Sequence, residues 1–426
     1  MELYLEAERE SGLTEEEIKG AVQRSSETFL RDRELERVLI IPPDFTRFYS
    51  NAGQITKEYY HAFIEKGCQV DILPALGSHE PMTREQFSIM YGDIPYEKML
   101  VHHWRKDVTA IGEVPASYMK EITEGLWEEP LKAEVSRLLL DPGYDLILSI
   151  GQVVPHEVVG MSNHSKNIFV GTGGSDMINK SHMVGAVYGM ERMMGKDYTP
   201  VRKAFDYALE HFLKELPLVF VLTVTTAPMG KIQTHGLFIG EKRDGLERAV
   251  ALSQKKNIDF VEKGMKKCVV YLDPSEFHST WLGNKAVYRT RMAMADGGEL
   301  LILAPGVRRF GEDDRCDELI RKYGYCGRLR MLELYRKESD LRENMAVSAH
   351  LIHGSSDGRF TVTYAVRDIA REEIEAVGYR SADYEEAVKR YDPEKLHYGW
   401  NVMEDGEEIF YVPNPAIGLW IDRNRF

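Results

Sequence analysis

Short runs of β-branched and apolar residues alternate along this chain with longer stretches of helical periodicity. Strands are expected at residues 38–42, 69–74, 98–103, 145–150, 216–223 and 267–272. Between them, the spacing of apolar residues predicts helices at 14–29, 55–66, 83–90, 201–214 and 245–256. Strands separated by helices favour a largely parallel sheet that is covered on both faces. Ligands bind such sheets at the carboxyl ends of the strands, so the residues that follow each strand are the first candidates for a site.

A second series of strands and helices begins near residue 267. It comprises expected helices at 284–294, 313–322, 328–337 and 382–391 and expected strands at 299–304 and 360–365. Because a single core stops growing near ~250 to 300 residues, a chain of 426 residues is expected to form two lobes with a cleft. We place the domains at 1–265 and 266–404. The apolar segments 409–413 and 417–421 should pack, and 405–426 can return to the first domain.

Composition excludes several classes of protein. With 54 Lys and Arg against 68 Asp and Glu, the formal charge is −14, which disfavours nucleic-acid binding through phosphates. No apolar run approaches the ~20 residues that cross a bilayer, so no membrane association is expected. The N-terminus lacks the basic and apolar pattern of a secretory signal, so a cytoplasmic location is expected. The four cysteines form no CxxC pair, which disfavours a structural zinc site.

The first expected strand is followed by Asp44, Thr46 and Arg47. Together these side chains offer an acceptor, a hydroxyl and a two-pronged cation that suits a carboxylate or phosphate. The alternative is that Asp44 caps the next helix and Arg47 pairs with it on the surface.

The second expected strand leads into Gly77, Ser78 and His79. Gly77 permits a sharp turn, after which His79 can accept a proton near neutral pH. A single histidine is more often structural, and His102 and His103 are interpreted in that way.

The segment after the fourth expected strand carries His156, His164, Lys166 and His182, together with the turn 171–175. Glycine-rich turns let backbone N–H groups approach an anion. The spacing matches neither a Walker motif nor GxGxxG, and no HExxH is present, so nucleotide triphosphate, dinucleotide and zinc-hydrolase sites are disfavoured. A packed loop without a metal remains the structural alternative.

Taken together, these segments resemble the lactate racemase family. The matching pieces are Asp44-Phe45-Thr46-Arg47, Gly77-Ser78-His79, Pro155-His156, Lys166, His182 and, within Trp281-Leu282-Gly283-Asn284-Lys285, Lys285. They occur in the family's order and at comparable separations. The resemblance covers residues 44 to 285.

The resemblance implies a Rossmann-like N-terminal domain with a parallel sheet, a smaller α/β C-terminal domain and an active site in the cleft between them. It also implies a nickel-pincer nucleotide, nickel pyridinium-3,5-bisthiocarboxylic acid mononucleotide. Lys166 would hold this cofactor covalently and His182 would supply the protein ligand to square-planar nickel. The residues expected to bind its phosphate and ribose are Asp44, Thr46, Ser162, Gly173 and Gly174. Its partners would be the maturation enzymes, namely a carboxylase/hydrolase, a sulfur transferase and a nickel insertase.

The reaction implied by the resemblance inverts carbon 2 of a 2-hydroxy acid by reversible hydride transfer to the cofactor. His79 and His156 would be the two acid/base groups, one for each isomer. Arg47 and Lys285 would hold the substrate carboxylate.

Three positions depart from the family pattern. The lysine is preceded by the bulkier Ser162-Asn163-His164-Ser165, Leu282 replaces a glutamine, and Phe48 replaces a proline. These changes favour a substrate larger than lactate, such as a sugar acid. The alternatives are a lactate or malate racemase of the same family, an NAD-dependent 2-hydroxy acid dehydrogenase, and a binding protein without activity.

Overall fold

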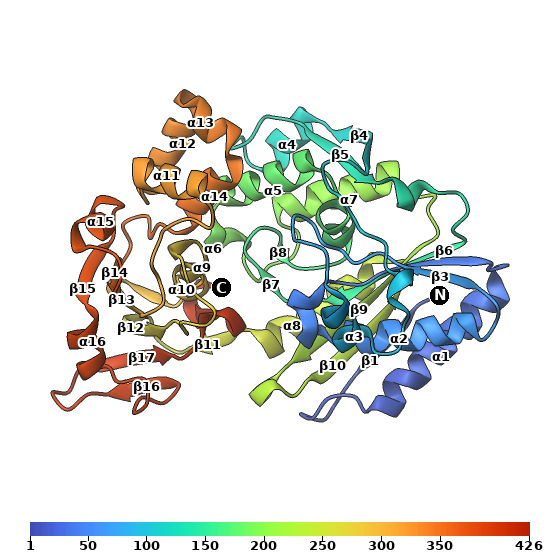
Figure 1. Cartoon of the computed structure of the whole chain (residues 1–426), viewed down its shortest axis with the longest axis horizontal. Coiled ribbons are helices and arrows are strands. Elements are labelled where there is room, and N and C mark those ends of the chain that lie inside the picture. The colour runs from blue at the N-terminus through green and yellow to red at the C-terminus, as the bar shows by residue number, and fades with distance from the viewer. The chain divides into compact units, whose positions relative to one another are not determined.

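The computed structural model describes residues 1–426 apart from the side chains of residues 229 and 417. It contains two compact units, shown in Figure 1. The first comprises Met1–Val184 and Met193–Asn257, and the second comprises Gly185–Arg192 and Ile258–Phe426. In the described part of the chain, no helix is both long and apolar enough to span a bilayer.

The first unit is built on a six-stranded sheet with the order β1-β10-β9-β6-β2-β3. Its strands are β1 (Leu3–Glu6), β2 (Arg37–Ile41), β3 (Gln69–Ile72), β6 (Leu146–Gln152), β9 (Leu218–Thr226) and β10 (Gln233–Gly240). The four strands β3, β2, β6 and β9 are parallel, and β10 and β1 continue the sheet antiparallel. Because β3 lies on one side of β2 and β6 on the other, the chain changes direction at β2, where a ligand crevice is expected.

Helices cover both faces of this sheet. The helices of the first unit are α1 (Glu15–Asp32), α2 (Ala52–Ile64), α3 (Arg84–Tyr91), α4 (Ala116–Ile122), α5 (Ser175–Tyr188, in this unit up to Val184), α7 (Pro200–Phe212) and α8 (Arg243–Asn257). Buried residues of α1, α2 and α3 share one core with Val38, Leu148 and Val219 of the sheet. On the opposite face, α8 packs on β9 and β10, and Leu252 fills the space above Gly236. Two small antiparallel pairs lie outside the sheet, namely β4 (Val108–Val114) with β5 (Leu131–Ser136), and β7 (Pro155–His156) with β8 (Gly160–Met161).

The second unit has its own six-stranded sheet, with the order β15-β14-β13-β12-β17-β16. Its strands are β12 (Met265–Tyr271), β13 (Met294–Ala304), β14 (Thr361–Val366), β15 (Arg380–Asp383), β16 (Gly399–Val402) and β17 (Glu408–Val412), and β11 (Asp259–Val261) pairs separately with β18 (Trp420–Asp422). Its helices are α6 (Met190–Met193), α9 (Thr280–Gly283), α10 (Lys285–Thr290), α11 (Asp314–Tyr323), α12 (Arg328–Lys337), α13 (Ser339–Glu343), α14 (Met345–His353), α15 (Arg371–Ala376) and α16 (Tyr384–Arg390). All strands except β16 run parallel to their neighbours in this sheet.

The α/β class and the parallel-rich sheets are confirmed, but two expectations about single segments differ from the structure. Residues 98–103 form no strand, because only Met99 bridges to Ile72 of β3 before the chain leaves the sheet. Residues 405–426 do not complete the first sheet. Instead, β17 pairs with β12 through Cys268 and Phe410, and β18 pairs with β11, so this segment belongs to the second unit.

Candidate active site

The carboxyl end of β2 carries a buried aspartate that is paired with a histidine. Asp44 caps the 3-10 helix Phe45–Ser50, where its Oδ1 accepts hydrogen bonds from the N–H (3.2 Å) and Oγ1 (2.5 Å) of Thr46. Its Oδ2 lies 2.7 Å from Nδ1 of His79. Burial opposes ionisation of Asp44, but the bonds to His79 and Thr46 outweigh it and hold the pKa of this carboxyl below its usual value. The carboxylate therefore accepts Nδ1–H of His79, which leaves Nε2 of His79 free to accept a proton.

The turn after β3 positions His79. Gly77 has a positive φ of 56°, and its N–H donates to the carbonyl of Gly171, 2.8 Å away. The N–H of His79 donates to the carbonyl of Leu76. The bond between Gly77 and Gly171 thus joins the loops that follow β3 and β6, and the His79 ring is positioned to bond Asp44.

His156 lies in the β7–β8 hairpin and is 8% exposed. Its Nδ1 accepts the backbone N–H of Val158 at 3.1 Å. Because a backbone N–H can only donate, Nδ1 is the unprotonated nitrogen and neutral His156 carries its proton on Nε2. Burial lowers the pKa of His156 well below its usual value, and the charges of Lys166 and Arg47 act in the same direction. The ring is therefore neutral near pH 7.

A buried arginine holds the loop that leads to Lys166. Arg202 of α7 donates to the carbonyls of Met161 (2.6 Å) and Asn163 (3.0 Å) and to Oγ of Ser165 (2.8 Å). These bonds support a loop whose residues Asn163 and His164 both have positive φ. His164 is buried and stacks on Phe220, with 3.8 Å between ring centroids, so it shapes the loop.

Ser162 also serves this loop. Its Oγ donates to the carbonyl of Gln152 at 2.6 Å and accepts the N–H of Val154 at 3.0 Å. The hydroxyl is therefore used to fasten the loop to the end of β6.

Lys166 precedes a π-helical turn, Asn167–Gly171, and its side chain is partly buried. Burial, together with the charge of Arg47 and against the opposing charges of Glu157 and Asp44, lowers the pKa of Lys166 to about 8. A lysine with such a pKa is partly neutral near pH 7, and the neutral amine is the form that forms covalent bonds.

His182 lies on α5, and its Nδ1 is 2.6 Å from the carbonyl of Ile178. Since a carbonyl can only accept, Nδ1 carries the proton and Nε2 has a free lone pair. Metal-binding histidines have the same arrangement, in which the other ring nitrogen donates its proton to a carbonyl or carboxylate. Burial and the charge of Lys166 lower the pKa of His182, which favours the neutral, metal-binding form.

Eight of the predicted site residues line one pocket of about 230 Å³ at the carboxyl ends of β2, β3 and β6. They are Asp44, Thr46, Arg47, His79, His156, Ser162, Lys166 and His182. Gln152, Glu157 and Asn163, which were not predicted as site residues, also line this pocket. Their position directly after a predicted strand, beside His156 and Lys166, was the signal that could have identified them. The charge of Glu157 acts on His156, Lys166 and His182, so its carboxylate lies near all three.

Three predicted site residues do not line this pocket. Gly173 bridges to Val135 of β5, and its carbonyl is 3.0 Å from Nε2 of His102. A Cβ on Gly174 would lie 2.2 Å from the Glu134 side chain. These two glycines therefore allow close packing against β5, and His102 has the structural role expected for it. Lys285 belongs to the second unit, where it begins α10 and its Nζ lies 5.6 Å from the centre of the Phe277 ring.

The described residues contain no group of three or more His, Cys, Asp or Glu side chains that could hold a metal ion. A metal in this pocket would need most of its ligands from another group. The free Nε2 of His182 and the amine of Lys166 fit a cofactor that brings its own donors and needs one imidazole and one covalent attachment.

The fold and the pocket define an α/β protein with its ligand site at the carboxyl ends of parallel strands. The family model described as the lactate racemase N-terminal domain matches residues 5–194, which is less than half of the chain. No curated protein matches the chain significantly in sequence.

Two solved structures resemble the whole chain. A protein from Thermotoga maritima is 24% identical with a TM-score of 0.77, and the alignment covers 98% of this chain and 99% of that one. The lactate racemase apoprotein from Thermoanaerobacterium thermosaccharolyticum is 17% identical with a TM-score of 0.70, covering 95% of this chain and 92% of that one. At 24% and 17% sequence identity, these two structures show that this chain shares their fold.

Proposed function

We propose that this protein is a racemase or epimerase that inverts carbon 2 of a 2-hydroxy acid with a nickel-pincer nucleotide. The observation that carries the proposal is the gathering of His79, His156, Lys166 and His182 in one pocket. Two imidazoles there are suited to acid/base work, and a lysine and a third imidazole are suited to holding the cofactor.

Lys166 would attach the cofactor covalently, and Nε2 of His182 would bind its nickel. Bound in this way, the group supplies reversible acceptance of a hydride from carbon 2. The bond from Nδ1 of His182 to Ile178 keeps the imidazole in the tautomer that metal binding requires.

His79 is ready to act as a base. Asp44 holds Nδ1–H, so Nε2 can take the hydroxyl proton of one isomer, and the carboxylate stabilises the imidazolium that forms. His156 starts from the opposite state, with its proton on Nε2. To act as a base toward the other isomer, His156 must release the N–H of Val158 and carry its proton on Nδ1.

Arg47 would bind the substrate carboxylate. Its charge contributes to the lowered pKa values of Lys166 and His156, so the guanidinium lies near both. Lys285 keeps its predicted role as a second carboxylate-binding residue. We further propose that the substrate is larger than lactate, since the polar side chains of Gln152, Glu157 and Asn163 line the pocket and could bond additional hydroxyls.

The first test measures the cofactor. The chain is produced together with the cofactor maturation enzymes and analysed for nickel and by intact mass. The wild type should carry about one nickel per chain and an added mass on Lys166, and Lys166→Ala should lack the added mass. Wild-type protein with neither nickel nor added mass would overturn the proposal.

The second test measures the reaction. Loaded enzyme is incubated with single isomers of lactate, malate, phenyllactate and aldonates. One of these should be converted to its epimer without deuterium uptake at carbon 2 from heavy water. His79→Ala should abolish the conversion, whereas His103→Ala, at an exposed histidine outside the pocket lining, should not. Uptake of deuterium would indicate proton abstraction, and keto acid formed with free NAD would indicate a dehydrogenase.

A further inference from the structure

Helix α5 contributes to both compact units. Its residues up to Val184, including His182, belong to the first unit, and the segment Gly185–Arg192 belongs to the second. The helix that carries the proposed nickel ligand is therefore fixed at its far end by residues that follow much later in the sequence.

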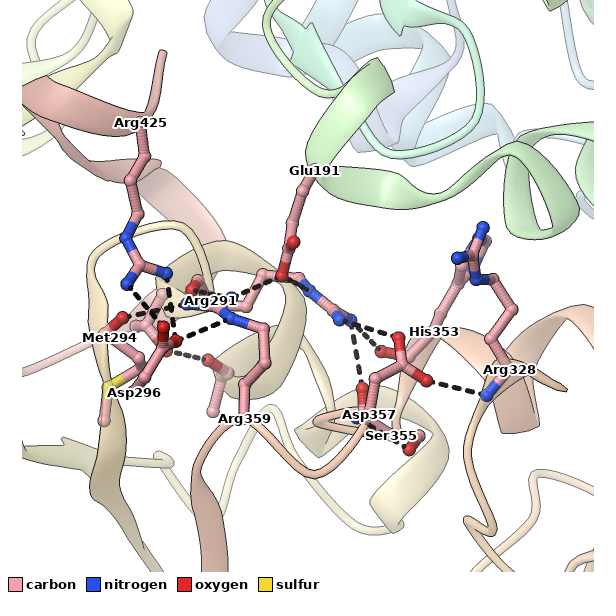
Figure 2. A network of polar contacts seen from close by, with 12 residues as sticks. Glu191, Arg291, Met294, Asp296, Arg328, His353, Ser355, Asp357, Arg359 and Arg425 are labelled. Carbon is pink, nitrogen blue, oxygen red and sulfur yellow. Dashed lines mark hydrogen bonds and ion pairs between the residues drawn. The ribbon is translucent and has the colours of Figure 1, made fainter. Parts of the chain in front are cut away.

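Glu191 lies on α6, just beyond Gly189, and makes the central contact of the segment Gly185–Arg192. Its Oε1 accepts Nε of Arg291 at 3.0 Å and Nη1 of Arg359 at 2.5 Å, as Figure 2 shows. Arg291 is 3% exposed, and its Nη1 donates to the carbonyls of His353 and Ser355. Arg359 also donates from Nε to Asp296 at 2.9 Å.

The last turn of α5 has a second attachment. Nη1 of Arg328 donates to the carbonyl of Val187 at 2.9 Å, which satisfies one of the acceptors that a helix end leaves open. Asp357 joins the two attachments, because it accepts the N–H of Arg328 at 2.7 Å and Nη2 of Arg291 at 3.3 Å. Figure 2 shows Arg291 linked to Glu191 and, through Asp357, to the backbone of Arg328.

The carboxylate of Glu191 is shared by Arg291 and Arg359, each of which also pairs with an aspartate, Asp357 and Asp296 respectively. Arg291 is almost completely buried, and a buried guanidinium needs a compensating charge. An amide at position 191 could accept one hydrogen bond, but it would leave Asp357 as the carboxylate beside Arg291 and Asp296 as the carboxylate beside Arg359. Loss of the Glu191 charge should therefore increase the mobility of Gly185–Arg192. Fraying at the C-terminal end of α5 should extend to the preceding turn of this helix, where His182 lies.

We propose that Glu191 is a positioning residue for His182. By binding Arg291 and Arg359 it holds α6 and, through the short connection at Gly189, the C-terminal end of α5, and α5 in turn holds the imidazole that would ligate nickel. This inference rests on the proposed function for the role of His182.

The experiment compares Glu191→Gln with Glu299→Gln. Glu299 is a matched control in the same unit, because it also accepts from a cation, Lys267 (2.6 Å), and from a hydroxyl, that of Thr363 (2.7 Å), and none of these contacts involves residues 185–192. Amide hydrogen exchange is measured on the cofactor-free chains across residues 179–192. Nickel loss from the loaded chains is followed by absorbance during challenge with EDTA.

Glu191→Gln should exchange these amides faster and lose nickel about tenfold faster than the wild type, the low end of the effect seen when groups behind a metal ligand are removed. Glu299→Gln should do neither. Glu191→Asp keeps the charge and should restore nickel retention to within about threefold of the wild type. In a His182→Ala background, Glu191→Gln should cause no further change in the absorption spectrum.

The outcomes separate the two proposals. If the wild type holds nickel and Glu191→Gln retains it as long as Glu299→Gln does, the positioning role is overturned and the proposed function stands. Faster nickel loss without faster exchange at residues 179–192 also overturns it. Wild-type protein that carries no nickel overturns the proposed function and this inference with it.

Discussion

Replacement of Arg202 by methionine tests how the loop before Lys166 is held. Arg202 is 1% exposed and donates to the carbonyls of Met161 and Asn163 and to the hydroxyl of Ser165. Methionine keeps much of the aliphatic volume but has no donor for these acceptors.

The cost can be worked from those contacts. Two buried carbonyls lose their partner, and each such loss costs about 1–3 kcal/mol. The Ser165 hydroxyl keeps its bond to Asp206, and Asp206 keeps its ion pair with Arg243 at 3.1 Å, so no buried carboxylate is left unpaired. We expect a loss of about 3 kcal/mol, which for a unit of this size lowers Tm by roughly 6–12 °C.

The melting temperature is measured by scanning calorimetry and far-UV circular dichroism. Arg202 lies in the first unit, so the substitution should lower the melting transition of that unit and leave that of the second unit unchanged. Arg31→Met is the control, since Arg31 pairs with Asp32 at a side chain that is 72% exposed. This control should stay within about 0.5 kcal/mol of the wild type. If Arg202→Met melted at the same temperature as Arg31→Met, the loop would not depend on this arginine and the reasoning would be refuted.

Three further predictions concern a base, a turn and a pH response. Asp44→Asn should lower kcat for isomer interconversion about 100-fold, because an amide does not fix Nδ1–H of His79 or stabilise its imidazolium, and an unchanged kcat would contradict this. Gly173→Ala should destabilise the protein by about 3 kcal/mol, since its Cβ would lie 1.8 Å from the Phe169 carbonyl, whereas Gly20→Ala within α1 should stabilise it by about 0.5–1 kcal/mol in urea unfolding. Burial opposes ionisation of Glu191, but Arg291 and Arg359 hold the pKa of this carboxyl in the folded protein below its usual value of 4.5. The ionised carboxylate therefore stabilises the fold above pH 4.5, and this stabilisation is lost as the pH falls through the folded-state pKa. Thermal melts at pH 3–6 should show a smaller acid loss in Glu191→Gln than in the wild type.

The regular elements of this chain could largely be predicted from local sequence. The apolar spacing that predicts a helix at 14–29 corresponds to α1, whose start is set by a capping box between Thr14 and Glu17. Both features lie within one helix and need no distant partner. The candidate residues after β2, β3 and β6 could be selected for a similar reason, because parallel strands bring their carboxyl ends to one edge.

Elements whose formation depends on distant partners were not predicted. β1 and β10 complete the first sheet by pairing Leu5 with Leu237, residues from opposite ends of the unit. The apolar run near Met99 looks like a strand, yet it finds a single bridging partner in Ile72. Whether a run becomes a strand depends on a neighbour with free backbone groups, and that neighbour is chosen by the packing of the whole unit.

The sequence by itself determined that imidazoles and a lysine would follow the parallel strands, because side-chain type and strand order are local properties. Only the tertiary structure decided which nitrogen of each imidazole is available. Asp44 leaves Nε2 of His79 free, Val158 leaves the proton of His156 on Nε2, and Ile178 leaves a lone pair on His182. A ring nitrogen takes its state from the atom it touches, and these contacts exist only after the chain has folded.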